Sequence, residues 1–236
     1  MKDANRYSTP ILLFAAAASI AGALLYTHSG GGITGGTPAG VAAPAVAVAI
    51  QEVKTDANPF IGSKDAPTTL ALFYDYQCPF GKPFEQTVLP QLIKNYVSTG
   101  KLRIVFKDFQ FLGEDSTTAG LYARAVWELY PSSYYDWYRA VFAAQDTGSN
   151  QRFGSLASIQ KLTATIPGID SQKVTDLMNR KKEIYLKAIT ADRAEGAALG
   201  IKSTPTIIVG TKLLTGLSSA EYYAAISMEL DKELRS

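Results

Sequence analysis

The sequence predicts an α/β domain in the order strand–helix–strand, helical block, strand–strand–helix, joined at its N-terminus to an apolar segment by a flexible linker. Three observations predict it: a β-rich run that ends just before the one cysteine, helical periodicity over about residues 112–200, and a hairpin pattern after Pro205. The 236 residues suffice for one such domain with appendages.

The first half of the domain reads as a βαβ unit. Residues 68–74 (TTLALFY) form a β-rich run of strand length, and apolar side chains then recur at helical spacing over residues 84–96. Pro83 and Pro90 interrupt that run and are expected to bend the helix. Residues 102–106 (LRIVF) form the next strand, so the two strands are predicted to pair in parallel.

The second half is a helical block followed by a hairpin and a last helix. The helices predicted for the block cover residues 115–129, 132–144, 154–163 and a long segment that starts at a Ser171 cap. Residues 206–209 (TIIV) and 212–215 (KLLT) flank a Gly-Thr turn and predict the hairpin. Ser218 and Glu221 form a capping box for a final helix that runs through Leu230.

Charge and residue counts exclude several functions. The net charge is +2 and the basic residues form no cluster, which argues against nucleic-acid binding. A single cysteine excludes an intramolecular disulfide and a cysteine-rich zinc site. The single histidine, His28, precedes the domain, which excludes a Ser-His-Asp triad or a histidine-based metal site within it. We therefore expect no metal and no cofactor.

The N-terminal segment predicts a membrane anchor. Residues 10–26 carry no charge and are about as long as the shortest membrane-spanning helices, ~17 residues. Lys2 and Arg6 precede this run and no basic residue follows closely, so the domain is expected outside the cytoplasm. We expect residues 1–28 to be an uncleaved anchor; the alternative is a signal segment, cleaved near residues 21–23, that releases the domain.

A flexible linker is predicted after the anchor. Residues 29–57 are rich in Gly, Ala and Pro, which favours a flexible and partly extended chain. The globular domain is accordingly placed at residues 58–236.

Two motifs of this domain resemble those of the DsbA-like family, which has a thioredoxin fold. The first motif consists of residues 62–67 (GSKDAP), 73–80 (FYDYQCPF), 88–92 (VLPQL) and 100–109 (GKLRIVFKDF). The second, residues 200–206 (GIKSTPT), resembles the family's loop with a cis proline. The resemblance implies a thioredoxin fold with a helical insertion at about residues 112–200, and thiol–disulfide exchange on cysteine-containing proteins or peptides.

The reactive motif departs from the family pattern. This chain has Cys78-Pro79-Phe80-Gly81 where the family has Cys-Pro-x-Cys or another Cys-x-x-Cys motif, so a glycine replaces the resolving cysteine. Leu72 stands where the family often has a buried acid, and Gln110 stands where a proline is common. Because an internal disulfide needs two cysteines, the chain cannot store an oxidising equivalent, and dithiol oxidase activity is excluded.

Cys78 is the expected nucleophile. Pro79 favours the first helical position, so Cys78 is predicted to cap the following helix, where unpaired N–H groups and the helix dipole favour the thiolate. Lys82 would add a little positive charge. The alternative is that Cys78 is a small hydrophobic residue of the core.

The resemblance also implies roles for residues around Cys78. It implies a cis Thr204–Pro205 bond in a loop beside Cys78, with the Thr204 backbone available to an extended substrate segment. Asp75 and Glu85 are the nearest acids in the sequence; they either relay protons or, as we favour, are solvated or salt-bridged surface groups. A tyrosine- and tryptophan-rich stretch, residues 130–138, either lines a substrate groove or, by default, packs the helical block.

Three functions remain open. We favour a monothiol exchange protein of isomerase or reductase type, whose mixed disulfide an external thiol must resolve. The alternatives are a non-catalytic peptide-binding chaperone or assembly factor and a thiol peroxidase that acts through a sulfenic acid. A cysteine introduced at position 81 is expected to fit and to supply the second thiol of the motif.

Overall fold

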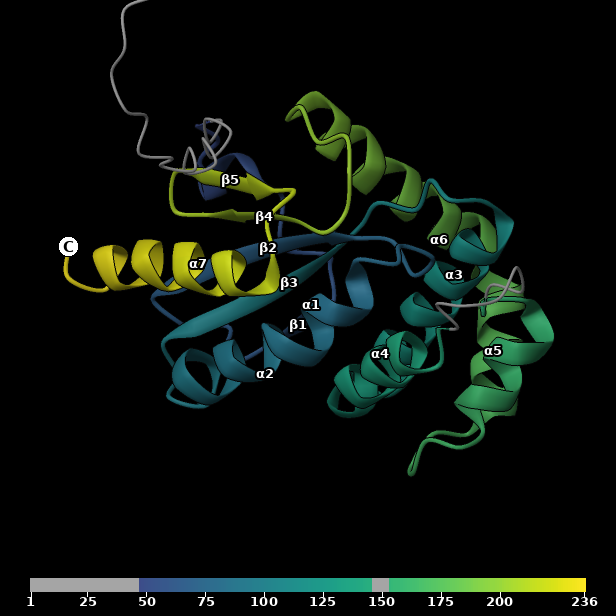
Figure 1. Cartoon of the computed structure of the whole chain (residues 1–236). Coiled ribbons are helices and arrows are strands. Elements are labelled where there is room, and N and C mark those ends of the chain that lie inside the picture. Colours follow the sequence, from purple (N-terminus) through teal and green to yellow (C-terminus); the bar gives the residue numbers. More distant parts are fainter. Residues whose placement is uncertain (1–46, 146–152) are drawn as a thin grey trace, which may run out of the picture. The chain divides into compact units, whose positions relative to one another are not determined.

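The computed structural model describes residues 47–145 and 153–236 (Figure 1). Within them a five-stranded sheet has the order β1-β3-β2-β4-β5. Its strands are β1 (Phe60–Ile61), β2 (Thr68–Tyr74), β3 (Leu102–Asp108), β4 (Thr206–Val209) and β5 (Lys212–Thr215). β2 and β3 pair in parallel, and the other pairs are antiparallel. This is the predicted βαβ and ββ arrangement.

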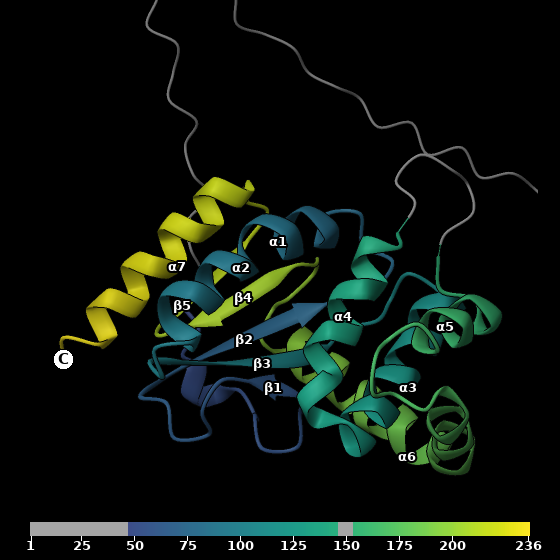
Figure 2. The same cartoon turned by 90° about the horizontal axis from the view of Figure 1, so that it is seen from below.

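Helices cover both faces of the sheet. They are α1 (Gly81–Thr87), α2 (Leu89–Leu92), α3 (Glu114–Leu129), α4 (Tyr134–Ala143), α5 (Leu156–Thr163), α6 (Ser171–Ala198) and α7 (Ser219–Glu233). Short turns of other helix types are η1 (Ile50–Glu52), η2 (Ile93–Val97) and η3 (Pro131–Ser133). Figure 2 shows α1, α2 and α7 on one side of the sheet, and α3, α4 and α5 gathered at one end. The predicted helical insertion is therefore α3 to α6.

The central strand β2 is buried on both faces because its side chains alternate between two cores. Leu70, Leu72 and Tyr74 belong to the core beneath α1, α2 and α7. Ala71 and Phe73 belong to the second core on the opposite face. A strand that is buried on both faces has a nearly continuous apolar sequence, and this pattern predicted β2.

The sequence predicted the N-terminal caps of α6 and α7, and the structure confirms only the cap of α7. The Ser218–Glu221 capping box is confirmed at α7. The predicted cap of α6 is wrong by one residue, because the Asp170 carboxylate accepts the N–H groups of Gln172 and Lys173 at 3.1 Å. Ser171 is instead the first helical residue, and its hydroxyl donates to the Gln160 carbonyl.

The helix after the cysteine is broken as its prolines predict. α1 and α2 are separate helices on either side of Val88, and a π-helical turn follows at Ile93–Val97. Pro90 has no N–H to donate to the preceding turn, so the hydrogen-bond ladder cannot pass through it.

Part of the segment expected to be linker packs on the sheet. Val48, Ile50 and Val53 are buried in the second core beside Ile208. Lys54 donates its backbone N–H to Glu195 of α6, and Ala57 accepts from Arg124. The end of residues 29–57 therefore belongs to the folded unit, because three apolar side chains within a short span bury surface there.

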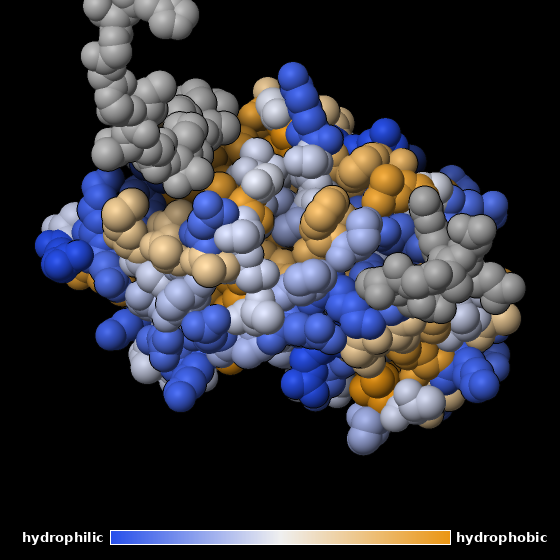
Figure 3. Space-filling view, viewed as in Figure 1, coloured by the Kyte–Doolittle hydropathy of each residue, from blue (hydrophilic) through white to orange (hydrophobic). Residues whose placement is uncertain are grey.

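The predicted anchor, residues 10–26, lies outside the described residues. Among the helices that the structure does describe, none is long and apolar enough to cross a membrane. On the face shown in Figure 3, hydrophilic residues separate smaller hydrophobic patches.

A buried cluster of charges joins the N-terminal segment to the helical block. Arg124 of α3 contacts Asp108 and Asp192 at 2.6 Å each. Lys107 contacts Asp192 at 2.5 Å and Glu195 at 2.9 Å. Burial, and secondarily the charge of Asp108, raises the pKa of Asp192, against the effect of the two cations. Charges this deep are tolerated only when each has a partner.

We expect Arg124→Ala to lower the free energy of unfolding by about 3–5 kcal/mol, because buried Asp108 would lose its cationic partner and Asp192 would keep only Lys107. Urea unfolding of the purified protein measures the change. The matched control is Lys173→Ala, which removes a solvent-exposed pair with Asp170 and should cost about 0–1 kcal/mol. Equal losses in the two variants would contradict a buried, coupled cluster.

Candidate active site

Cys78 lies just past the end of β2, in a turn that leads into α1. Its backbone N–H donates to the Asp75 carbonyl at 3.0 Å, and its own carbonyl accepts from Gly81 N–H at 3.0 Å. The predicted N-cap position is therefore wrong: α1 begins at Gly81 and Phe80 occupies the cap position. The carbonyl of Cys78 closes a turn before the helix begins, so the helix starts later than Pro79 alone predicts.

The cis-proline loop lies against the sulfur, as predicted. The Thr204–Pro205 bond is cis. The Cys78 thiol donates to the Thr204 carbonyl, with 3.0 Å between Sγ and O. The Tyr222 hydroxyl of α7 donates to the Pro205 carbonyl at 2.7 Å and holds the loop from the other side.

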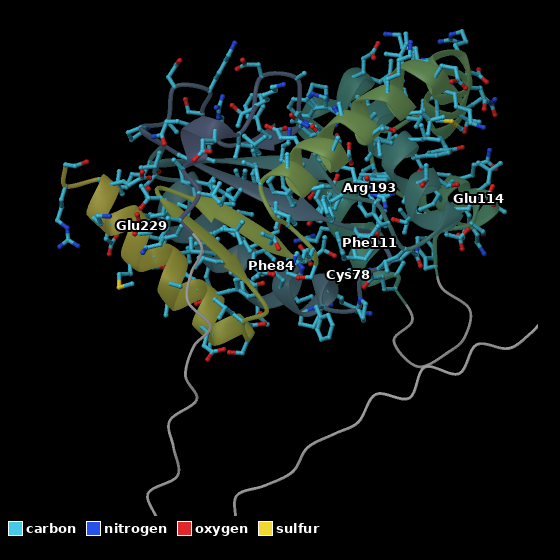
Figure 4. The ribbon with its side chains drawn as sticks, turned by 90° about the horizontal axis from the view of Figure 1, so that it is seen from above. Cys78, Phe84, Phe111, Glu114, Arg193 and Glu229 are labelled. Atoms are coloured by element: carbon cyan, nitrogen blue, oxygen red, sulfur yellow. The ribbon has the colours of Figure 1, made fainter. Side chains whose placement is uncertain are left out.

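A groove runs along the loop next to the cysteine. It has a volume of about 370 Å³ and includes Phe84, Thr204, Pro205, Leu217 and Tyr222 in its lining. The first three of these also line the small hollow around Cys78, so the groove and the hollow adjoin. Figure 4 shows Cys78 and Phe84 close together.

Exposure differs sharply across this site. Phe80, at the edge of the groove, is 71% exposed, whereas Cys78 is 4% exposed. The Thr204 hydroxyl is also buried and has no hydrogen-bond partner among the described residues. The site therefore presents an apolar rim outside and a thiol with an unpaired hydroxyl inside.

Gln145, which follows α4, fixes the turn that carries the cysteine. Its side-chain amide donates to the carbonyls of Tyr76 and Cys78. Lys82 donates to the carbonyls of Ala143 and Gln145, at 3.0 and 2.8 Å. Lys82 thus binds the end of α4, where a cation suits the helix dipole, rather than serving only as a charge near Cys78. No sequence pattern signals Gln145, which lies 67 residues from Cys78.

Asp75 is buried, so the favoured interpretation of it as a solvated or salt-bridged surface group is wrong. One carboxylate oxygen accepts from Gln77 N–H and the Ser116 hydroxyl, and the other accepts from Phe111 N–H and Leu112 N–H. Four donors saturate the carboxylate. Asp75 thereby joins the strand end that precedes Cys78 to the start of the helical block.

Glu85 is also buried, contrary to the same interpretation. The side chain is 2% exposed, and Tyr135 donates its hydroxyl to Oε1 at 3.2 Å. Burial raises the pKa of Glu85, and the Tyr135 hydrogen bond and the Arg139 charge offset part of this. Among the described hydrogen bonds, neither Glu85 nor Asp75 joins its carboxylate to Cys78.

Gly81 is packed against an aromatic ring. A Cβ at this position would lie 2.3 Å from Cε1 of Phe142 in α4, and 3.1 Å from Cδ1 and Cζ. The expectation that a cysteine fits here is therefore wrong for the chain as it stands. The cause is tertiary, because Phe142 lies on a different helix.

The aromatic stretch of the block packs the core, as expected by default. Tyr134, Trp137 and Tyr138 are fully buried, whereas Tyr130 and Tyr135 are partly buried. Burial raises the pKa of Tyr138 well above its usual range, so its phenol stays neutral.

The two other departures from the family pattern are also buried. Leu72 lines the hollow around Cys78 and is fully buried. Gln110 donates its amide N–H to Asp108 at 2.9 Å. The hollow wall at position 72 is therefore apolar, and Gln110 extends the buried charge cluster.

Comparisons with known proteins agree with this architecture. A family model described as Thioredoxin matches residues 54–228. Disulfide bond formation protein D of Bacillus subtilis (strain 168) is 28% identical over 180 residues, which cover 75% of this chain and 78% of that protein. The crystal structure of oxidised BdbD from Bacillus subtilis matches with a TM-score of 0.70 and 26% identity, over 81% of this chain and 99% of that one. DsbA of Chlamydia trachomatis, with a TM-score of 0.66 and 20% identity over 78% of this chain and 96% of that one, shares the fold.

We expect Gln145→Ala to destabilise the protein by about 1–3 kcal/mol, because the buried Tyr76 carbonyl loses a donor and the Cys78 carbonyl keeps only Gly81 N–H. The turn should also open more often, so iodoacetamide should modify Cys78 faster than in the native protein. Gln91→Ala, which removes an exposed amide of α2, should leave both the urea midpoint and the alkylation rate unchanged. An unchanged alkylation rate in Gln145→Ala would refute a positioning role.

The raised pKa of Glu85 predicts that ionisation of this carboxyl lowers the free energy of unfolding as pH rises. The folded state holds the proton more tightly than the unfolded chain, so stability is lost as pH rises from the unfolded value towards the folded pKa. Glu85→Gln has no carboxyl to ionise there. The free energy of unfolding in urea should therefore increase in this variant relative to the native protein as pH rises from about 4 to neutrality. Glu183→Gln, at an exposed position of α6, should show no such trend. A constant difference across pH would contradict the assignment.

Proposed function

Because this chain belongs to the thioredoxin family and to its DsbA-like group of thiol–disulfide oxidoreductases, we propose that it exchanges thiols and disulfides through Cys78 alone. The observation that carries the proposal is the contact of the Cys78 sulfur with the Thr204 carbonyl at the edge of a groove. A peptide bound along this loop would lie next to the sulfur.

The groove supports a protein or peptide substrate. An extended segment can align with the backbone of the loop before β4, in the manner of strand addition. Phe80 and Leu217 offer apolar contact to such a segment. The proposed substrate is therefore an extended, cysteine-containing segment with apolar neighbours.

The proposed exchange has two steps. The Cys78 thiolate attacks one sulfur of a substrate disulfide and forms a mixed disulfide, while the other substrate sulfur leaves as a thiolate and takes up a proton. A second thiol then attacks the mixed disulfide and releases Cys78. If that thiol belongs to the substrate, the disulfide is rearranged without net redox change; if it is external, the substrate is reduced and the external thiol is oxidised.

Proton relay by Asp75 or Glu85 remains a prediction. Glu85 is the better candidate, because its raised pKa lets it hold a proton nearer neutral pH. Asp75 is occupied by four donors that fix the backbone. A lower exchange rate in Glu85→Gln with unchanged peptide affinity would support a relay.

A peptide-binding protein without catalysis is the second candidate. The observation that favours it is the 4% exposure of Cys78 beside a groove that the thiol does not itself line. Such a protein would bind extended segments through Phe80 and Leu217 and would not need the sulfur.

Alkylation separates the two candidates. For an exchange protein, iodoacetamide should modify native Cys78 faster at neutral pH than it modifies the cysteine of an unfolded peptide. The full-length protein should also form a mixed disulfide with a peptide disulfide, and Cys78→Ser should not. Slow alkylation with peptide binding unchanged in Cys78→Ser would favour the binding protein.

We also propose that residues 1–28 anchor the domain to the membrane, on the outer side. The support is the uncharged run after Lys2 and Arg6. External protease applied to intact cells or spheroplasts should digest the domain. A domain that is digested only after lysis would disprove this topology, and a mature protein that lacks residues 1–28 would show the segment to be cleaved.

A further inference from the structure

The backbone around Cys78 has the geometry of a two-cysteine site. Gly81 N–H donates to the Cys78 carbonyl at 3.0 Å, which closes a turn of four residues. Such a turn brings its first and last Cα atoms within about 7 Å. A disulfide needs about 4.4–6.8 Å between Cα atoms. The main chain therefore does not by itself exclude a disulfide between positions 78 and 81.

The side chain of Phe142 excludes a disulfide between positions 78 and 81. The ideal Cβ of a residue at position 81 would lie 2.3 Å from Cε1 of Phe142, well inside the contact distance of two carbon atoms. Glycine is the residue that avoids this overlap, and Gly81 is itself buried. A sulfur beyond that Cβ would need still more of the space that the ring fills.

The ring of Phe142 is held on several sides. Its centroid lies 4.9 Å from that of Tyr138, 5.5 Å from Tyr76 and 6.4 Å from Tyr74. Phe142 is fully buried, and close-packed interiors leave little space for a ring to swing aside. The overlap at position 81 therefore cannot be relieved cheaply.

We propose that Phe142 is a specificity-determining residue that restricts Cys78 to one-thiol chemistry. The proposal rests on the exchange function proposed above. The hollow around Cys78 has no room for a water molecule, and Phe142, Tyr138 and Leu72 help to form its wall. Among the residues that the structure describes, these side chains fill the inner side of the site, so a resolving thiol is expected to reach the mixed disulfide from the groove beside Pro205, which means from the substrate or from a separate molecule.

The test introduces a second thiol at position 81, in one variant with the Phe142 ring present and in another with the ring removed. Full-length native protein, Gly81→Cys, Phe142→Ala and the double variant are incubated with oxidised glutathione and analysed by mass spectrometry. In the double variant, Cys78 attacks glutathione disulfide and releases one glutathione; the introduced thiol then attacks Cys78 Sγ and releases the second. Two electrons pass from the two protein thiols to glutathione disulfide, and the protein loses two hydrogens.

We expect the double variant to form the internal disulfide, and Gly81→Cys alone not to form it. Native protein and Phe142→Ala should each carry one glutathione. The proposal is overturned if Gly81→Cys forms the internal disulfide as readily as the double variant. It is also overturned if the double variant folds yet carries two glutathiones.

A double-mutant cycle of stability in urea tests, without redox chemistry, whether a side chain at position 81 overlaps the Phe142 ring. Gly81→Ala should lower the urea midpoint of the native protein despite the better helix propensity of alanine. In the Phe142→Ala background it should leave the midpoint unchanged or raise it. Equal effects in both backgrounds would refute coupling between the two positions even if Gly81→Cys does not fold. Absence of glutathione on native Cys78 would refute the exchange function instead, and the cycle would still decide the role of Phe142.

Discussion

The antiparallel pairing of β2 with β4 is the constraint on which the site depends. Phe73 lies opposite Thr206 in this ladder, so the end of β2 and the beginning of β4 meet at the same end of the sheet. Cys78 follows β2 and Thr204 precedes β4, which brings a sulfur and a carbonyl into contact across 126 residues of sequence. A different register between β2 and β4 would separate the thiol from the loop and the groove.

The helical insertion is part of the site rather than an attachment to it. Gln145, which follows α4, holds the carbonyl of Cys78, and Phe142 of α4 closes the space beneath it. Ser116 of α3 and the backbone that precedes α3 bind the carboxylate of Asp75. Loosening α4 should therefore alter the cysteine as well as the stability of the block, because buried polar groups of both are paired with each other.

Local patterns predicted the strands and helices, and the family resemblance predicted the contact between the cis-proline loop and Cys78, but the side chains of the helical block that reach the site were missed. Residues 68–74, 206–209 and 212–215 were predicted to the residue because apolar β-rich runs and turn residues define them. The helix cap at Asp170 differed by one position, since Asp and Ser adjoin and both can cap. Gln145 and Phe142 carry no pattern that points to Cys78, and the burial of Asp75 depends on donors more than thirty residues away.

Three buried positions around Cys78 are physically consistent with each other. Gly81 admits the Phe142 ring, the ring leaves no space for a second thiol, and Leu72 completes an apolar wall. A buried acid at position 72 would need a polar partner, and this wall has no room for a water molecule to serve as one. The inner side of the site is thus apolar and tightly packed, while Pro205 and the exposed Phe80 line the groove on its outer side. Among the residues that the structure describes, the open approach to Cys78 is from that outer side, so we expect a substrate and a resolving thiol to reach the sulfur there.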